Sequence, residues 1–170
     1  MKKLTRQEIE ASIAAVGSKQ IVLVGQDLRG LDLSGINLEG ANLNSAQLQG
    51  AHLDQARLKG ARLQQADLAG ADLTYADLAK ADFYRADLHS ATLQHANLQE
   101  AYFGNTDLRG ADLRECNLSK ARFHFANMRD ADLRDANLKG ADLTNARYNN
   151  ATRWPDGLDP TMVGALWRRR

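Results

Sequence analysis

Four histidines and one cysteine are among the side chains of this sequence that could bind a metal or act as a nucleophile or general base: His52, His89, His95, His124 and Cys116. A metal site needs several such side chains close together, and nucleophilic catalysis needs a nucleophile beside a base. The single cysteine excludes an intramolecular disulfide framework and most cysteine-rich zinc sites. No glycine-rich phosphate-binding loop precedes a predicted helix. Whether the histidines converge depends on the elements that carry them.

One internal repeat of five residues builds most of the chain. From residue 21 to residue 150 the sequence reads as 26 consecutive units without an insertion or a deletion. We call the third residue of each unit the centre and the first residue the slot. Leu occupies 21 of the 26 centres and Ala occupies 20 of the 26 slots. Most units therefore supply one large and one small apolar side chain to a common core.

A period of five fits neither an α-helix, with 3.6 residues per turn, nor a strand, in which side chains alternate. It requires a backbone that turns one corner per unit, so that every centre faces the same axis. Four corners per circuit predict a square coil of 20 residues. Phe83, Phe103 and Phe123 occupy centres 20 residues apart, so their rings are predicted to stack in one column of the structural core.

The pattern Ala-(Asp/Asn)-Leu-x-x resembles the pentapeptide-repeat family, as in Ala71-Asp72-Leu73-Thr74-Tyr75. The resemblance covers 130 of the 170 residues. It implies an all-β solenoid, namely a right-handed quadrilateral parallel β-helix with four units per coil. The 26 units would then form about six and a half coils.

The segments on either side of the repeat (21–150) are predicted to cap its open ends, which would otherwise expose apolar side chains and backbone edges. In residues 1–20, Thr5 and Glu8 form a capping box that predicts a short N-terminal capping helix over 5–16. In residues 151–170, Ala151 is expected to keep the slot and Arg153 to occupy the centre, after which the repeat stops. The remainder is predicted to fold over the last coil and to end in a solvated basic tail at 168–170.

The 20-residue coil also separates the histidines. If its four faces are named A to D from Ile21, His124 lies on face A, His89 on face B, and His52 and His95 on face C, two coils apart. No two of them converge, and a core filled with Leu leaves no concave pocket. We therefore expect a protein that is not an enzyme and that uses no cofactor and no metal.

Face A gathers the most unusual outward side chains of the repeat. Three successive coils place seven residues there, which we call the face-A patch: Tyr84, Arg85, Tyr102, Asn105, Arg122, His124 and Phe125. Aromatic and arginine side chains together are typical of the centre of a protein–protein interface. The hypothesis is that the protein is a rigid, non-enzymatic rod that presents this patch to an unidentified protein partner. A regulatory role is part of this hypothesis. The alternative is structural, with the rings merely covering corners and stacking on one another.

Charged residues on the same face suggest contacts between coils. The residue before each centre points outward, and a shift of 20 places Arg62 beside Asp82 and Arg122 beside Asp142. These two pairs are expected to form exposed ion pairs, each contributing a few tenths of a kcal/mol.

Net charge bears on a second functional hypothesis. Some proteins of the resembled family mimic DNA and bind gyrase or topoisomerase, and such mimicry needs a long negative stripe. The repeat carries 17 acidic and 14 basic side chains, a formal net charge of −3. The whole chain has a formal net charge of +1, which argues against direct binding of nucleic acid. Interaction with a protein partner through the face-A patch is therefore the first hypothesis, and DNA mimicry is the alternative function.

Location and assembly follow from what the sequence lacks. No apolar run approaches the roughly 18 residues of a membrane span. No apolar stretch typical of a secretory signal follows Met1. A cytoplasmic protein without a membrane association is expected, as a monomer or a cap-mediated dimer. End-to-end assembly through the caps is the third hypothesis.

Overall fold

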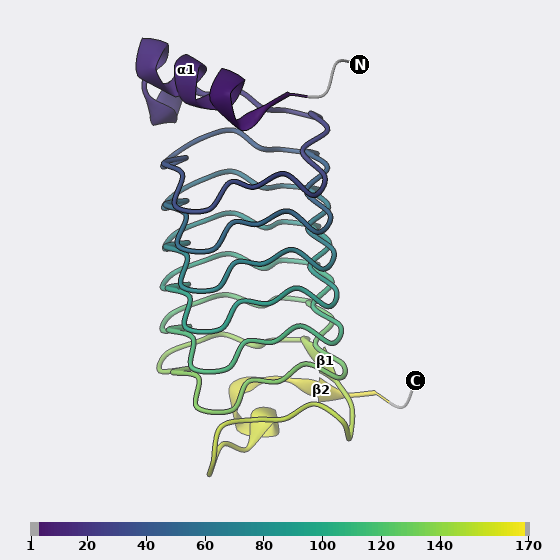
Figure 1. Cartoon of the computed structure of the whole chain (residues 1–170). Helices are drawn as coiled ribbons and strands as arrows, with labels where there is room; N and C mark the ends of the chain where they lie inside the picture. Colours follow the sequence, from purple (N-terminus) through teal and green to yellow (C-terminus); the bar gives the residue numbers. More distant parts are fainter. Residues whose placement is uncertain (1–3, 169–170) are drawn as a thin grey trace.

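The computed structural model describes residues 4–168; residues 1–3 and 169–170, which include most of the predicted basic tail, lie outside the described residues. Figure 1 shows the chain winding as a stack of coils from the N-terminal to the C-terminal end. Parallel bridges join residues that are 20 apart along the repeat, from Val22 with Asn42 to Asn127 with Arg147. Each coil therefore holds four five-residue units, as the sequence predicts.

Neighbouring coils are joined by short stretches of parallel hydrogen bonding. The N–H of Leu43 donates to the carbonyl of Arg62 (2.7 Å), and the N–H of Arg62 donates to the carbonyl of Ala41 (2.9 Å). The chain turns immediately after each such pair of bonds. Regular strands in the described residues are therefore limited to β1 (Arg147–Tyr148) and β2 (Leu166–Trp167), which pair in parallel.

The last residue of every unit up to Asn145 turns the corner with a positive φ. Glycine adopts this conformation easily, but 16 non-glycine residues share it, among them Tyr75 and Phe125, both with φ of 59°. The next N–H then donates back to the preceding centre, as Ala46 does to Leu43 at 3.0 Å. This is the geometry of a type II turn, and it directs both turn residues outward.

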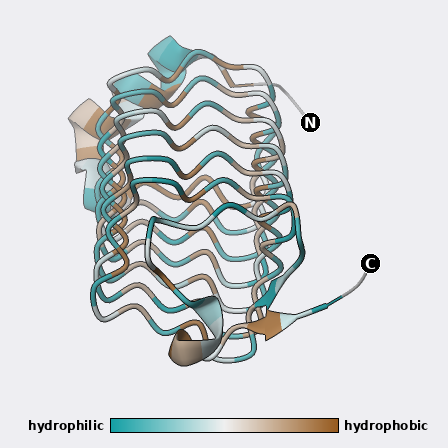
Figure 2. Ribbon diagram, turned by 90° about the horizontal axis from the view of Figure 1, so that it is seen from below, coloured by the Kyte–Doolittle hydropathy of each residue, from teal (hydrophilic) through white to brown (hydrophobic). Residues whose placement is uncertain are grey.

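The core consists of the centre side chains surrounded by the slot side chains, and Figure 2 shows apolar residues (brown) recurring at regular intervals along the coils. Phe83, Phe103 and Phe123 are fully buried in one column. Their ring centroids are 5.0 and 4.8 Å apart, with the planes within 3°. Two buried slots hold a hydroxyl or a thiol, and each donates to a carbonyl of the previous coil: Thr106 Oγ1 to Phe83 (2.7 Å) and Cys116 Sγ to Leu93 (2.9 Å).

Helix α1 (Arg6–Val16) lies across the N-terminal end of the stack. Thr5 is its N-cap, and the predicted capping box with Glu8 is present, so the helix proper begins one residue later than the predicted 5–16. Ile9 is 1% exposed and belongs to the core cluster, which ties the helix to the first coil. The short 3-10 helix η1 (Ser18–Gln20) links α1 to the repeat.

The prediction that Ala151 keeps the slot and Arg153 the centre is wrong. Thr152 takes the slot, where it is 8% exposed and its Oγ1 donates to the carbonyl of Met128 (3.0 Å). Arg153 forms a bridge with Asp132, 21 residues earlier, so it stands before the centre. One residue is therefore inserted ahead of Thr152, and it shifts Thr152 and Arg153 by one position relative to the repeat.

The chain then leaves the repeat and folds back onto the last coil. The 3-10 helix η2 (Pro160–Val163) follows, and β2 pairs with β1. Val163 and Trp154 pack against the core cluster, and Figure 2 shows η2 and β2 at the C-terminal end of the stack.

Candidate functional site

Four residues of the face-A patch form one continuous ladder of rings and guanidinium groups. The rings of Tyr84 and Tyr102 are stacked with centroids 6.0 Å apart and planes within 3°. Arg85 lies over the Tyr84 ring at 5.2 Å, and Arg122 lies over the Tyr102 ring at 4.7 Å from the centroid. The structure thus brings together two aromatic and two basic side chains that are up to 38 residues apart in the chain.

The ladder depends on a glycine that the sequence analysis did not single out. Tyr102 stands directly before its centre, whereas Tyr84 stands directly after its centre. The two tyrosines therefore occupy different positions of the repeat, and the 20-residue spacing alone does not place one ring over the other. Tyr102 reaches the column because Gly104 has no side chain: a Cβ there would lie 2.3 Å from Tyr102 Oη. Gly104 is the only glycine directly after a centre among the 26 units, and that exception was the available signal.

The other three residues of the patch continue the surface toward the C-terminus. Asn105 and Phe125 occupy the same corner as Arg85 in successive coils, and the Phe125 ring is 52% exposed. His124 Nε2 lies 2.7 Å from Asp142 Oδ2. Hydrogen bonds from Thr144, together with this contact, lower the pKa of Asp142 from its ordinary value.

The expected ion pairs between coils on face A are wrong. Asp82 accepts hydrogen bonds from Gln64 Nε2 (2.7 Å) and from the backbone of Tyr84 (3.0 Å), rather than from Arg62. Arg122 stacks on a ring, and Asp142 is bound to His124. Within residues 4–168, Arg85 and Arg122 have no carboxylate at ion-pair distance. The patch therefore presents positive charge beside aromatic rings.

A second aromatic column, on face C, was also missed. Tyr75 and His95 are stacked at 4.5 Å with planes 8° apart, and His95 Nδ1 lies 3.4 Å from Glu115 Oε2. All three occupy unit ends spaced by 20 residues, so the same rule that aligned Phe83 with Phe103 would have found them.

The side chains that could bind a metal ion, namely those of His, Cys, Asp and Glu, form no cluster of three or more with metal-binding geometry among the described residues 4–168. Burial raises the pKa of the Cys116 thiol to about 12. In the same part of the chain, no helix is long and apolar enough to span a bilayer.

A model of the pentapeptide-repeat family matches the chain in eight copies, over residues 23–60, 51–89, 61–99 and 96–135. These matches span more than half of the chain, and the protein belongs to the pentapeptide-repeat family. Proteins of this family fold as right-handed quadrilateral β-helices, in agreement with the 20-residue coil.

Several solved structures are similar to the chain. HetL, a protein involved in heterocyst differentiation regulation in the cyanobacterium Nostoc sp. strain PCC 7120, is 24% identical over 96% of this chain and 92% of HetL (TM-score 0.45). Rfr23 from the cyanobacterium Cyanothece 51142 is 22% identical over 85% of this chain and 96% of its own (TM-score 0.51). QnrB1, a plasmid-mediated fluoroquinolone resistance protein, is 22% identical over 86% of this chain and 84% of the QnrB1 chain (TM-score 0.48). At these identities the likeness is one of fold alone. No curated protein matches the sequence.

Proposed function

We propose that this protein is a non-enzymatic interaction module, a rod that holds a protein partner against the face-A patch. The observation that carries the proposal is the ladder formed by Arg85, Tyr84, Tyr102 and Arg122. Tyrosine and arginine, with tryptophan, are the residue types enriched among side chains that dominate binding energy. Here they are assembled on one face before any partner arrives.

The geometry of the ladder favours binding in two ways. The rings are fixed by mutual stacking and by the close approach of Tyr102 to Gly104, so little side-chain entropy would be lost on association. The two guanidinium groups have no carboxylate partners within the described residues, although arginine pairs readily with carboxylates in a bidentate manner. A partner segment that combines acidic and aromatic side chains fits this surface.

The test compares the wild-type protein with the variant Tyr84→Ser/Tyr102→Ser/Phe125→Ser in affinity capture from lysate of the native organism. The matched control is Tyr75→Ser, which removes an exposed aromatic ring at a unit end on face C. We expect wild type and control to retain the same protein and the triple variant to lose it, with circular dichroism showing that all three are folded. Equal retention by the triple variant would contradict the proposal.

DNA mimicry directed at gyrase is the alternative function, and the same capture experiment distinguishes it. Four aspartates of the rod are paired with an arginine of their own unit, as in the ion pairs Asp107–Arg109 (2.7 Å) and Asp112–Arg114 (2.8 Å). Such pairing weakens the negative field that a duplex mimic needs. Recovery of gyrase subunits by wild type and triple variant alike would support the alternative.

The finer description of the rod is part of this proposal. We propose about six and a half right-handed coils, capped by α1 at one end and by residues 151–168 at the other. A capped rod is expected in the cytoplasm as a monomer or a cap-mediated dimer. Light scattering at several concentrations tests this, because end-to-end assembly would make the mass rise continuously with concentration.

A further inference from the structure

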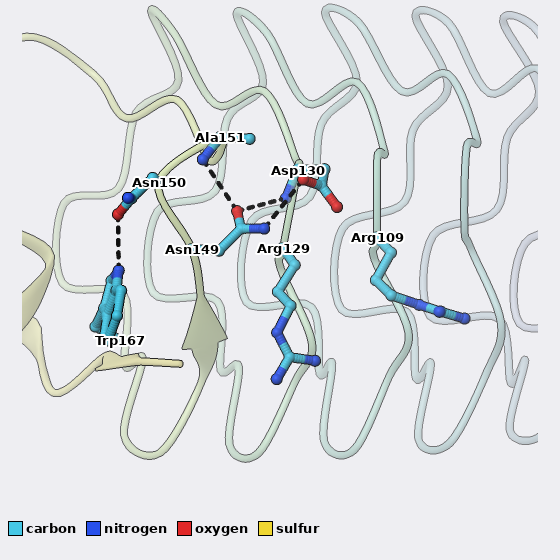
Figure 3. Close-up of a pocket in the computed structure, with 7 residues that line it drawn as sticks. All are labelled: Arg109, Arg129, Asp130, Asn149, Asn150, Ala151 and Trp167. Carbon is cyan, nitrogen blue, oxygen red and sulfur yellow. Dashed lines mark hydrogen bonds between the residues drawn. The ribbon is translucent and has the colours of Figure 1, made fainter. Parts of the chain in front are cut away.

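A hollow of about 530 Å³ opens on face B near the C-terminal end of the rod (Figure 3). The side chains that line it are Arg109, Arg129, Asp130, Asn149, Asn150, Ala151 and Trp167. It lies where the inserted residue ahead of Thr152 enlarges the turn and where β2 brings Trp167 beside that turn. The break in the repeat therefore creates a concave surface on a rod that is otherwise regular.

The walls of the hollow are held by hydrogen bonds. Asn149 Oδ1 accepts from the backbone of Asp130 (3.1 Å) and of Ala151 (3.2 Å), and its Nδ2 donates to Asp130 Oδ1 (3.0 Å). Trp167 Nε1 donates to Asn150 Oδ1 (2.9 Å), while the residue stays 47% exposed. The indole is thus anchored by its polar edge and offers apolar surface to the hollow.

Arg129 is the exception in a set of five equivalent arginines. Each follows a centre whose preceding residue is Asp or Asn: Arg29, Arg109, Arg114, Arg129 and Arg134. Four of these arginines have an Asp two residues earlier and form an ion pair of 2.6–2.8 Å with it. Arg129 is preceded by the neutral Asn127, whose Oδ1 lies 3.5 Å from Arg129 Nη1.

Arg129 is therefore incompletely satisfied. It makes no ion pair with any residue of 4–168, and its Nε is buried without a hydrogen-bond partner. The neighbouring charges in the hollow are already engaged: Arg109 is held by Asp107 at 2.7 Å and points away from Trp167 in Figure 3, and Asp130 is bound to Asn149. An unpaired guanidinium and an exposed indole that line the same hollow form a site for an anion with a flat apolar body.

We propose that this hollow binds a small carboxylate ligand, with its carboxylate at Arg129, in the role that an Asp side chain fills at the other four arginines, and its apolar body against Trp167. The carboxylate could belong to a free organic acid or to the C-terminus of a peptide, and both share this chemistry. The site is independent of the face-A patch and of any partner bound there.

The direct test is NMR titration of the full chain with benzoate, with benzamide as the neutral probe of the same shape. We expect benzoate, and not benzamide, to shift the Trp167 indole Nε1–H resonance in a saturable way, while the Trp154 resonance, from an indole packed against the core, stays in place. N-acetyl-alanyl-phenylalanine and its C-terminal amide form the second arm, and stronger binding of this acid than of benzoate would assign the ligand to peptide C-termini. Equal shifts with benzoate and benzamide, or saturation by inorganic phosphate but not by benzoate, would overturn the proposal.

Two variants make the test specific to Arg129. Asn127→Asp restores the internal carboxylate seen at Asp107 one coil earlier, and we expect it to weaken benzoate binding by about tenfold or more without loss of the fold. Arg129→Gln is expected to weaken binding to a similar extent. Arg114→Gln on face C is the control and should bind as wild type does. Unchanged affinity in both Asn127→Asp and Arg129→Gln would refute the assignment.

Discussion

Tyr102 folds back over Gly104, so that a Cβ on Gly104 would lie 2.3 Å from Tyr102 Oη and 2.4 Å from its Cζ. The phenol thereby fills the place that a side chain after the centre takes in the coils on either side. This local arrangement aligns the ring with Tyr84 and exposes its other face to Arg122.

Gly104→Ala is expected to displace the Tyr102 ring and to lower the free energy of unfolding by about 1 kcal/mol, through loss of the ring stacking. The φ of Gly104 is not positive, so alanine adds no backbone strain, and its effect on the flexibility of the unfolded chain is the same in every background. Urea unfolding measures the change in free energy. In the Tyr102→Ala background the same substitution should cost nothing, and an equal cost in both backgrounds would show that the two residues are not coupled.

Phe103 lies between two other rings in the core, and Phe83 lies at the end of that stack. Phe103→Leu loses two ring contacts and should lower the free energy of unfolding by about 1–3 kcal/mol, whereas Phe83→Leu loses one and should cost about half as much. Leu itself fits a centre, as its use at 21 of 26 positions shows. Chemical denaturation of both variants tests the ratio; equal costs would mean that ring stacking adds nothing beyond burial.

The features that were predictable from sequence are those fixed by the 20-residue spacing. The coil and the column of Phe83, Phe103 and Phe123 follow directly, because a backbone corner every five residues leaves each centre no other direction. An outward side chain can contact any of several neighbouring side chains, and the 20-residue spacing does not determine which of these contacts forms. Arginines after a centre pair with Asp two residues earlier, because both side chains flank an inward residue and share one outer surface.

The inserted residue ahead of Thr152 was hidden for a different reason. Ala151 and Thr152 are both small enough for a slot, so the sequence allows either register. Thr152 takes the slot because its hydroxyl reaches the carbonyl of Met128, as Thr106 reaches that of Phe83. Only the three-dimensional structure distinguishes the two registers, and the hollow at Arg129 depends on that choice.

Acid is expected to destabilise the rod through its aspartates, and Asp132 provides the test. The hydrogen bond from Arg134 is the main cause that lowers the pKa of Asp132 below its ordinary value of 3.8. A carboxyl whose pKa is lower in the folded state stabilises the fold above its unfolded pKa, and this contribution is lost as the pH falls through the folded pKa. When melting temperatures are measured from pH 7 down to pH 2.5, they should begin to decrease once the pH is lower than about 4. Asp132→Asn should melt lower at pH 7 and lose less on acidification; parallel curves for the variant and wild type would contradict this role.

Cys116 should be chemically inert in the folded protein. Its thiol is 1% exposed, donates to the carbonyl of Leu93 at 2.9 Å and has a pKa raised to about 12 by burial. Alkylation requires the thiolate, so native protein at pH 8 should resist iodoacetamide, whereas protein unfolded in guanidinium chloride should react at the rate of a free cysteine. Cys116→Ala is the matched control: it should show no labelling in either state and should fold normally, since alanine fills 20 of the 26 slots. Rapid labelling of native protein would show that the coil around this slot opens locally, because the thiol cannot react while it remains between two packed coils.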